Sequence, residues 1–312
     1  MENNIKSNPR VAVMVMTYNA ENHINKCILP ILNEKTVDEV VVVNSSGTDK
    51  TVELSTKLGC RIIKVPRKEF NHGFTKEYAR RHIRCDILVC MSPDGYGNKG
   101  FIDRLVNDIK SDGVWMSYSR QIPHAGANIF ESLPRIFNYP NKSEIRNLKT
   151  WQKEGPSAIF CSNTCAAYLT QGLNKIGGFD TVLTGEDTVA AAKILLQGGA
   201  IKYNSESVIN HSHKYTLLQE FRRHFDAGYM RNFSRPEILM KFGSDNKKGK
   251  MFTQFFIKEV AKNNIFMLPY ALLNILFKYF GYQVGKHANL LPKRMVVKLS
   301  SQDFYWSSRF SK

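Results

Sequence analysis

Short apolar runs that alternate with helical segments constrain the fold of this 312-residue chain more than any other feature. Residues 11–16, 37–43 and 60–65 are apolar runs that stop at turn residues, as is typical of strands buried on both faces of a sheet. Helical patterns cover residues 23–32 and 51–58 between them. Strand, helix, strand, helix, strand in this order predicts βαβ units, and therefore an α/β fold with a mixed, mostly parallel sheet flanked by helices.

The segment 87–97 begins as a fourth apolar run and ends abruptly in Pro93, Asp94 and Gly95. Ligands of open α/β sheets bind just beyond the carboxyl ends of the strands. Asp94 is therefore expected where a carboxylate can face a metal ion or a phosphate. Asp also starts turns before glycine, and this segment alone fits either interpretation.

The rest of the first 240 residues continues the pattern less regularly. We expect helices over 75–84 and 101–109, and a strand over 114–119. Residues 120–156 contain four prolines and show no clear period, which indicates a functional loop region or a flexible segment. An apolar, strand-like pattern returns over 158–169.

Acidic and amide side chains follow several of the expected strands or open a helix, and these are Asn44, Asp49, Asp94, Glu186 and Asp187. Mg²⁺ commonly binds one or two carboxylates together with substrate phosphates, so this pattern predicts a phosphorylated ligand held through a divalent cation. Asp187 at a helix N-terminus would stay ionised and is a candidate general base for a hydroxyl group. The same residues would also cap the helix, and spacing does not separate the two roles.

The net charge and the cysteine content indicate which kinds of binding partner and which cellular compartment suit this chain. A net charge of +17 implies an anionic partner, which is nucleic acid, a membrane surface or a phosphorylated substrate. Six cysteines without a Cys-x-x-Cys pair favour reduced thiols in a cytoplasmic protein. The polar first ten residues predict no signal peptide, and we expect no stretch of the roughly 20 apolar residues that span a bilayer.

Residues 241–312 differ from the rest of the chain, with 13 Lys and Arg against 3 Asp and Glu. Their centre, 265–280, is apolar and aromatic but is interrupted by Pro269, Asn274 and Lys278. This pattern favours a helix that lies in the membrane interface with basic flanks. An ordinary helix packed on the rest of the chain is the alternative. A nucleic-acid partner is disfavoured because the basic excess lies in an apolar region without a recognition motif.

Several short motifs occur in the order seen in family 2 inverting glycosyltransferases: Thr17-Tyr18-Asn19, residues 44–51, Asn71-His72-Gly73, Ser92-Pro93-Asp94, residues 177–180 and Gly185-Glu186-Asp187. Residues 70–73, 119–123, 137–140, 162–163, 211–215 and 279–285 resemble bacterial rhamnosyltransferases of O-antigen and capsule assembly. The resemblance implies the GT-A fold, a Rossmann-like nucleotide-diphospho-sugar transferase architecture. It divides the chain into a catalytic domain (1–240) and a basic, helical, membrane-associating region (241–312). The catalytic domain would comprise a nucleotide-sugar-binding half (9–120) and an acceptor-binding half (121–240).

The resemblance also implies roles for individual residues. Asp94 corresponds to the retained carboxylate of the Asp-x-Asp metal motif, and Asp187 corresponds to the catalytic base, with Glu186 beside it. His211 is the further candidate metal ligand, and the alternative for His211 and His213 is hydrogen bonding within the fold. The implied nucleotide-sugar contacts are Thr17, Tyr18, Asn19, Asn44, Ser46, His72, Gly73, Lys76, Ser92, Asp94 and Arg120. The implied acceptor contacts are Ser162, Asn163 and Gly185.

By resemblance, the expected donor is dTDP-L-rhamnose, the acceptor is a saccharide on a polyprenyl diphosphate, and the cofactor is Mg²⁺ or Mn²⁺. The enzyme would be cytoplasmic and peripheral on the inner, anionic face of the cytoplasmic membrane. Two departures from the family pattern stand out: Asn44 replaces the usual Asp, and the metal motif keeps one carboxylate, Asp94. They keep two alternatives open, a catalytically impaired glycan- or lipid-binding relative and a family 2 transferase that uses another nucleotide sugar.

Overall fold

The computed structural model describes residues 7–311. Its strands are β1 (Val11–Thr17), β2 (Glu39–Asn44), β3 (Arg61–Lys64), β4 (Ile87–Met91), β5 (Tyr96–Gly97), β6 (Val114–Ile122), β7 (Glu144–Arg146), β8 (Cys165–Leu169) and β9 (Ala200–Asn210). They form one sheet in the order β3-β2-β1-β4-β8-β6-β9-β5, with β7 beside β9. The first four strands are parallel, whereas β8 runs antiparallel to both β4 and β6. The mixed, α/β fold class predicted from the sequence is confirmed.

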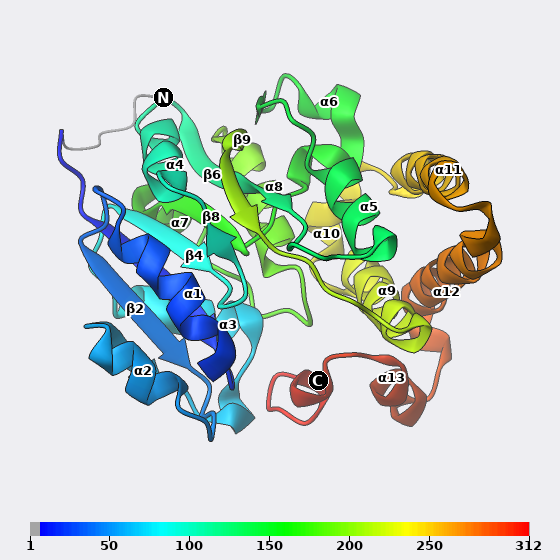
Figure 1. Cartoon of the computed structure of the whole chain (residues 1–312), viewed down its shortest axis with the longest axis horizontal. Helices are drawn as coiled ribbons and strands as arrows, with labels where there is room; N and C mark the ends of the chain where they lie inside the picture. The colour runs from blue at the N-terminus through cyan, green and yellow to red at the C-terminus, as the bar shows by residue number, and fades with distance from the viewer. Residues whose placement is uncertain (1–6, 312) are drawn as a thin grey trace.

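The core lies on both faces of this sheet. Strands β1, β2 and β4 consist almost entirely of buried Val, Ile, Leu, Met, Cys and Ala. Helix α1 (Glu21–Leu32) lies on the face turned toward the viewer in Figure 1 and buries Ile24, Cys27, Ile28 and Ile31. Helices α2 (Thr51–Lys57), α3 (His72–Arg81), α4 (Phe101–Ile109), α7 (Thr170–Lys175) and α8 (Glu186–Leu196) also flank the sheet.

The segment 120–156 is more regular than its sequence indicates. It contains β7 and the helices α5 (Ile129–Asn138) and α6 (Trp151–Glu154). Helix α5 begins with a capping box, in which Asn128 Oδ1 accepts a hydrogen bond from the Glu131 amide at 3.1 Å and Glu131 Oε1 accepts one from the Asn128 amide at 3.3 Å. Pro134 lies inside this helix, and a proline there conceals the helical pattern in the sequence.

The C-terminal third is helical, with α9 (Leu217–Phe233), α10 (Pro236–Leu239), α11 (Asn246–Asn263), α12 (Leu268–Lys286), α13 (Lys293–Leu299) and α14 (Asp303–Trp306). Helix α12 packs tightly against α9. A Cβ atom on Gly281 would lie 2.3 Å from the Phe221 carbonyl oxygen, and one on Gly285 would lie 2.0 Å from that of Phe225. Only glycine permits this approach. Helices α11 and α12 form the end of the molecule opposite β2 and α2 (Figure 1).

Within residues 7–311, one helical stretch, Ile265–Lys286, is long and apolar enough to cross a membrane by length and composition, with a mean hydropathy of 1.3. This stretch differs from the expectation that no segment is long and apolar enough to span a bilayer, because Asn274 and Lys278 interrupt the apolar pattern in the sequence. Residues after α13 return toward the first half of the chain, where the Phe304 ring contacts the ring of Phe70 at a centroid distance of 5.0 Å.

Candidate active site

Asp94 lies in the turn that follows β4, close to two histidines that follow β9. Its Oδ2 atom is 3.5 Å from His211 Nε2 and 3.3 Å from His213 Nε2. One ligand atom from each of the three residues lies within 4.8 Å of the others. The turn is also present, because the Gly95 amide donates to the Ser92 carbonyl at 3.2 Å. Asp94 is therefore part of a turn that begins at Ser92, and its carboxylate also lies beside two imidazoles, while a role as a metal ligand stays a prediction.

The hydrogen bonds of His211 determine which of its nitrogens faces Asp94. His211 Nδ1 lies 3.0 Å from Gln121 Oε1, and the Gln121 amide nitrogen donates to Ser162 Oγ at 2.9 Å. An amide oxygen only accepts, so His211 Nδ1 carries the proton and Nε2 presents its lone pair to Asp94. Burial lowers the pKa of His211, which favours this neutral form at pH 7.

A lone pair that faces an ionised carboxylate at this distance calls for a cation between them. Asp94, His211 and His213 supply one oxygen and two nitrogen ligands, and the Gln121 contact orients His211 as ligating histidines usually are oriented. These residues therefore fit a divalent metal. A set with two imidazoles suits a transition metal such as Mn²⁺ better than Mg²⁺, which prefers oxygen ligands.

Glu186 and Asp187 open helix α8, but their surroundings differ. Glu186 is buried and accepts hydrogen bonds from Lys76 Nζ at 2.7 Å and from Asn163 Nδ2 at 3.2 Å. Asp187 is half-buried and accepts from the backbone amides of Asn163 at 3.2 Å and Thr188 at 2.7 Å. Glu186 is therefore held as a fixed partner of Lys76, and Asp187 is the carboxylate that a substrate can approach.

The two carboxyl groups have pKa values shifted in opposite directions. Burial opposes ionisation of Glu186, but the charge of Lys76 and the hydrogen bonds from Lys76 and Asn163 act together to lower the Glu186 pKa. Burial and the neighbouring Glu186 charge raise the Asp187 pKa above its usual value of 3.8. Neighbouring carboxyl groups with separated pKa values are typical of acid–base sites.

A chain of contacts joins Asp187 to the Asp94 cluster. Asp187 accepts from the Asn163 amide, the adjacent Ser162 hydroxyl accepts from Gln121, and Gln121 in turn binds His211. The candidate base and the candidate metal ligands thus lie at one end of the sheet, as the strand ends predicted. Ser162 and Asn163 are part of this connection.

The predicted residues at the ends of β1 and β2 hold the turns there. Asn44 is buried, and its Oδ1 accepts from the Gly47 amide at 3.1 Å while its Nδ2 donates to Thr17 Oγ1 at 3.2 Å. Asn19 and Ser46 both adopt positive φ angles, of 47° and 57°. A contact of these residues with a nucleotide stays a prediction.

Tyr18 is an exposed aromatic residue of this group, and a cation lies over its ring. The guanidinium of Arg67, in the 3-10 helix η1 (Arg67–Glu69), is 4.0 Å from the Tyr18 ring centroid and 5.0 Å from that of Phe304. Through Arg67, the C-terminal residue Phe304 is connected to Tyr18 at the end of β1, a contact that the sequence did not indicate.

The start of α3 brings Lys76 to Glu186. A Cβ atom on Gly73 would lie 1.8 Å from the Asp180 carbonyl oxygen, so α3 can approach the loop before α8 only with glycine here. His72 precedes it, and burial, together with the charge of Lys76, lowers the His72 pKa to about 4. His72 is thus neutral at pH 7 and contacts the Phe304 ring at 5.7 Å.

Three predicted residues have local structural roles. Arg120 donates to the Tyr139 carbonyl at 3.3 Å and to Asn141 Oδ1 at 2.8 Å, so its bonds lead to the segment before β7. Ser92 pairs through its backbone amide with the Thr164 carbonyl at 3.2 Å. Gly185, with a φ of 77°, precedes α8.

The structure adds residues near Asp94 that sequence reasoning missed. His23 Nδ1 lies 2.5 Å from the Tyr96 hydroxyl, and the His124 ring lies 5.0 Å from the Tyr96 ring. The positive charges of Arg135 on α5 and Arg223 on α9 both act to lower the pKa of His211. They come from helices distant in sequence, and Arg135 lies in the segment expected to be irregular.

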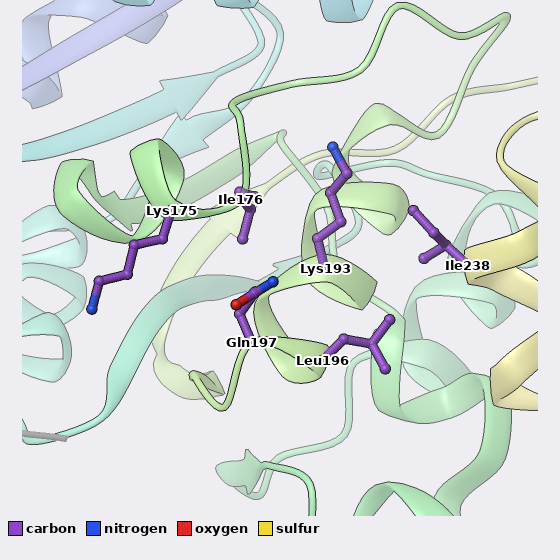
Figure 2. Close-up of a pocket in the computed structure, with 6 residues that line it drawn as sticks. All are labelled: Lys175, Ile176, Lys193, Leu196, Gln197 and Ile238. Atoms are coloured by element: carbon purple, nitrogen blue, oxygen red, sulfur yellow. The ribbon is translucent and has the colours of Figure 1, made fainter.

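A pocket of about 240 Å³ lies elsewhere, between α7, α8 and α10 (Figure 2). Its lining residues are Lys175, Ile176, Lys193, Leu196, Gln197 and Ile238. None of them belongs to the predicted site. The pocket is therefore distinct from the cluster around Asp94 and Asp187.

Comparison with known sequences places the chain in a family. The profile described as Glycosyl transferase family 2 matches residues 12–177. The O-antigen chain rhamnosyltransferase RfbN of Salmonella typhimurium is 31% identical over 305 residues, which cover 96% of each chain. The O-antigen chain rhamnosyltransferase WbaN of Salmonella anatum is 32% identical over 273 residues, which cover 86% of each chain.

Solved structures share the fold. A mannosyltransferase, PcManGT from Pyrobaculum calidifontis in complex with GDP-Man and Mn²⁺, superposes with a TM-score of 0.61 at 15% identity, covering 92% of this chain and 89% of its own. TarS 1-349 of S. aureus in complex with UDP-GlcNAc gives a TM-score of 0.53 at 14% identity, covering 90% and 91%. These similarities confirm the GT-A fold. Together with the profile match, the two curated relatives establish that the chain belongs to glycosyltransferase family 2 and is a glycosyltransferase.

Proposed function

We propose that this enzyme transfers L-rhamnose from dTDP-L-rhamnose, with inversion at the anomeric carbon, to a hydroxyl of a lipid-linked saccharide during bacterial surface polysaccharide synthesis. The similarity to two O-antigen chain rhamnosyltransferases over most of the chain supports the sugar and the pathway class. The single observation that carries the chemistry is the hydrogen-bonded connection between Asp187 and the cluster of Asp94, His211 and His213.

In this proposal Asp187 is the general base. Its raised pKa brings it closer to the operating pH, where a base transfers protons most effectively. Asp187 takes the proton of the acceptor hydroxyl, and the oxygen forms a bond to the sugar C1 while the bond from C1 to the diphosphate oxygen breaks on the opposite face. Glu186, held by Lys76, positions the start of α8 and keeps a negative charge beside Asp187.

Asp94, His211 and His213 would hold a divalent metal, for which we propose Mn²⁺ in preference to Mg²⁺. A bound metal stabilises negative charge on the leaving nucleoside diphosphate. Arg135 and Arg223, whose charges reach His211, add positive potential at the same place.

The donor would lie against the 9–120 half of a catalytic domain that spans 1–240. We propose that Thr17, Tyr18, Asn19, Asn44 and Ser46 border the nucleoside, and that the start of α3 and residues 92–94 border the diphosphate sugar. Ser162, Asn163 and Gly185, which adjoin Asp187, would contact the acceptor from the 121–240 half. The enzyme would act at the inner face of the cytoplasmic membrane, where a polyprenyl-linked acceptor is available.

A screen of nucleotide sugars tests this function directly. The purified full chain is incubated with dTDP-L-rhamnose and with UDP-, GDP- and other dTDP-sugars, each with Mn²⁺ or Mg²⁺, and release of the nucleoside diphosphate is measured. We expect dTDP-L-rhamnose with Mn²⁺ to be the best combination. A preference for another donor would refute the sugar assignment. Saccharide binding without turnover of any donor would instead support the catalytically impaired relative.

The role of Asp187 is tested by Asp187→Asn. We expect transfer to be lost while donor affinity, measured by calorimetry, stays near that of the wild type, because Asp187 contacts the acceptor. Asp112→Asn, at an exposed position after α4, is the matched control and should retain activity. Full transfer activity in Asp187→Asn would remove Asp187 from the role of base.

A further inference from the structure

Helix α12 places its side chains in the reverse of the arrangement usual in a water-soluble protein. Its buried residues are small, polar or charged: Ala271, Asn274, Lys278, Gly281 and Gly285. Its exposed residues include large apolar ones: Leu272, Leu273, Leu276, Tyr279 and Phe280. The exposed residues recur at intervals of three and four, so they form one continuous stripe along the helix.

Contacts with α9 hold α12 in this orientation. Lys278 Nζ lies 3.4 Å from Glu220 Oε1, and both side chains are buried. Gly281 and Gly285 lie against the backbone of α9 too closely for any side chain. Rotation of α12 to bury its leucines would separate the Lys278–Glu220 pair and drive side chains into α9. The exposed apolar stripe is therefore built into the packing.

The stripe continues into the short 3-10 helix η4 (Ile265–Met267) at the start of α12. Phe266 there is 91% exposed, and Ile265 is 62% exposed. We call the set Ile265, Phe266, Leu272, Leu273, Leu276, Tyr279 and Phe280 the α12 outer face. Helix α12 lies at the end of the molecule remote from β2 and α2 (Figure 1). Exposed apolar surface of this extent marks an interaction site.

The charge around the α12 outer face identifies the kind of partner. No Asp or Glu occurs between Glu259 and Asp303, whereas this interval contains six Lys or Arg residues. Lys262, Lys293, Arg294 and Lys298 among them are exposed. Aromatic and aliphatic side chains with basic neighbours match the interface of an anionic bilayer. A second copy would bring the same basic excess against itself and be repelled.

We propose that the α12 outer face docks the enzyme on an anionic lipid bilayer, with α12 lying in the interface rather than crossing the membrane. A crossing helix would have to carry the charge of Lys278 into the hydrocarbon and leave its contacts with α9. Docking along the stripe needs neither change, because the buried side of α12 stays on α9.

Helix α9 connects this surface to the candidate active site. It begins just after His211 and His213, and its Arg223 lies over the Tyr215 ring at 3.9 Å, while Glu220 reaches α12. A docked α12 would thus hold the site one helix away from the lipid surface. The biological reason for docking rests on the proposed function, since a polyprenyl-linked acceptor resides in that surface, but the docking itself is measured without catalysis.

Vesicle flotation of the full chain tests the inference. We expect the wild type to float with vesicles that contain phosphatidylglycerol and much less with pure phosphatidylcholine, and we expect added salt to weaken binding. The double variant Leu273→Glu/Leu276→Glu should bind anionic vesicles at least about tenfold more weakly, because two carboxylates replace apolar contacts at the surface.

The matched control is Leu29→Glu/Leu32→Glu on α1, which changes two leucines that are 50% and 46% exposed, against 46% for both Leu273 and Leu276. It should float like the wild type, and circular dichroism should show that both variants are folded. Wild type that stays in solution with anionic vesicles would overturn the inference. So would equal flotation of the two double variants, or a dimer in light scattering that Leu273→Glu/Leu276→Glu dissociates.

Transfer to a soluble saccharide acceptor, assayed in parallel, separates this inference from the proposed function. The Leu273→Glu/Leu276→Glu variant should retain that activity, because the changed residues lie away from Asp94 and Asp187. If no rhamnose is transferred but flotation behaves as expected, the proposed function fails and the docking surface stands.

Discussion

The buried ion pair between Lys76 and Glu186 offers a quantitative test of how the candidate site is held together. Their side chains are 6% and 7% exposed, and Lys76 Nζ lies 2.7 Å from Glu186 Oε1. The variant Lys76→Met keeps most of the side-chain volume but leaves the Glu186 carboxylate buried without its partner. Breaking a buried pair in this way costs about 3–5 kcal/mol of stability. We expect a loss of that size in the free energy of unfolding at pH 7.

The loss of unfolding free energy in Lys76→Met should depend on pH in a defined direction. In the wild type the Glu186 pKa is lowered, so the pair stabilises the fold above the usual Glu pKa of 4.5 and this contribution disappears as the pH falls through the folded value. Without Lys76, burial raises the Glu186 pKa instead. The destabilisation of Lys76→Met should therefore be largest at neutral pH and shrink as the pH falls and Glu186 becomes protonated.

Urea unfolding measures this loss of stability in Lys76→Met, in the double variant Lys76→Met/Glu186→Gln and in a matched control. Lys57 and Glu53 form an ion pair of nearly equal length, 2.6 Å, but their side chains are 69% and 54% exposed. Lys57→Met should therefore unfold almost as the wild type does. Lys76→Met/Glu186→Gln should recover part of the lost stability, because no charge is then buried alone. Equal unfolding free energies for Lys76→Met and Lys57→Met would refute the reasoning.

Three further outcomes follow from the site. Asp187 must be ionised to act as the base, and the Glu186 charge raises its pKa, so kcat/KM should fall on the acid side at a pH above the usual Asp value of 3.8. Glu186→Gln should shift this acid-side fall of kcat/KM to lower pH. A fall that stays at the same pH in Glu186→Gln would contradict the assignment of Asp187 as the base. His213→Ala should weaken Mn²⁺ binding by about tenfold or more in electron paramagnetic resonance titrations, whereas His82→Ala, at an exposed position, should not. Phe304→Ala removes the ring between Arg67 and His72 and should raise the KM for the donor more than it changes kcat; unchanged donor kinetics would make this contact purely structural.

Much of the fold follows from local sequence patterns. The apolar runs that became β1, β2 and β4 are short and end at turn residues, which is typical of buried strands, and the helices between them favour the parallel pairing that the structure has. Once the strands are parallel, their carboxyl ends meet at one edge of the sheet. The sequence therefore sufficed to place Asp94 at the mouth of the sheet, and the start of α8 to nominate Asp187.

The partners of these residues depended on contacts between distant segments. The insertion of β8 antiparallel between β4 and β6, which both lie far from it in the sequence, brings Ser162 and Asn163 beside Asp187. The difference between Glu186 and Asp187 arises because Lys76, on another helix, forms its hydrogen bond and ion pair with Glu186. Arg135 escaped notice because the proline inside α5 disguised a capped helix.

The C-terminal region also has some properties that follow from its sequence and others that only tertiary contacts decide. Its composition alone determined that 241–312 is basic and rich in apolar and aromatic residues, since those properties belong to the residues themselves. Which side of α12 meets water was decided by tertiary structure, because Gly281, Gly285 and Lys278 find their complements on α9. Sequence periodicity reports that a helix has two faces, whereas only the neighbouring helix determines which of them is buried.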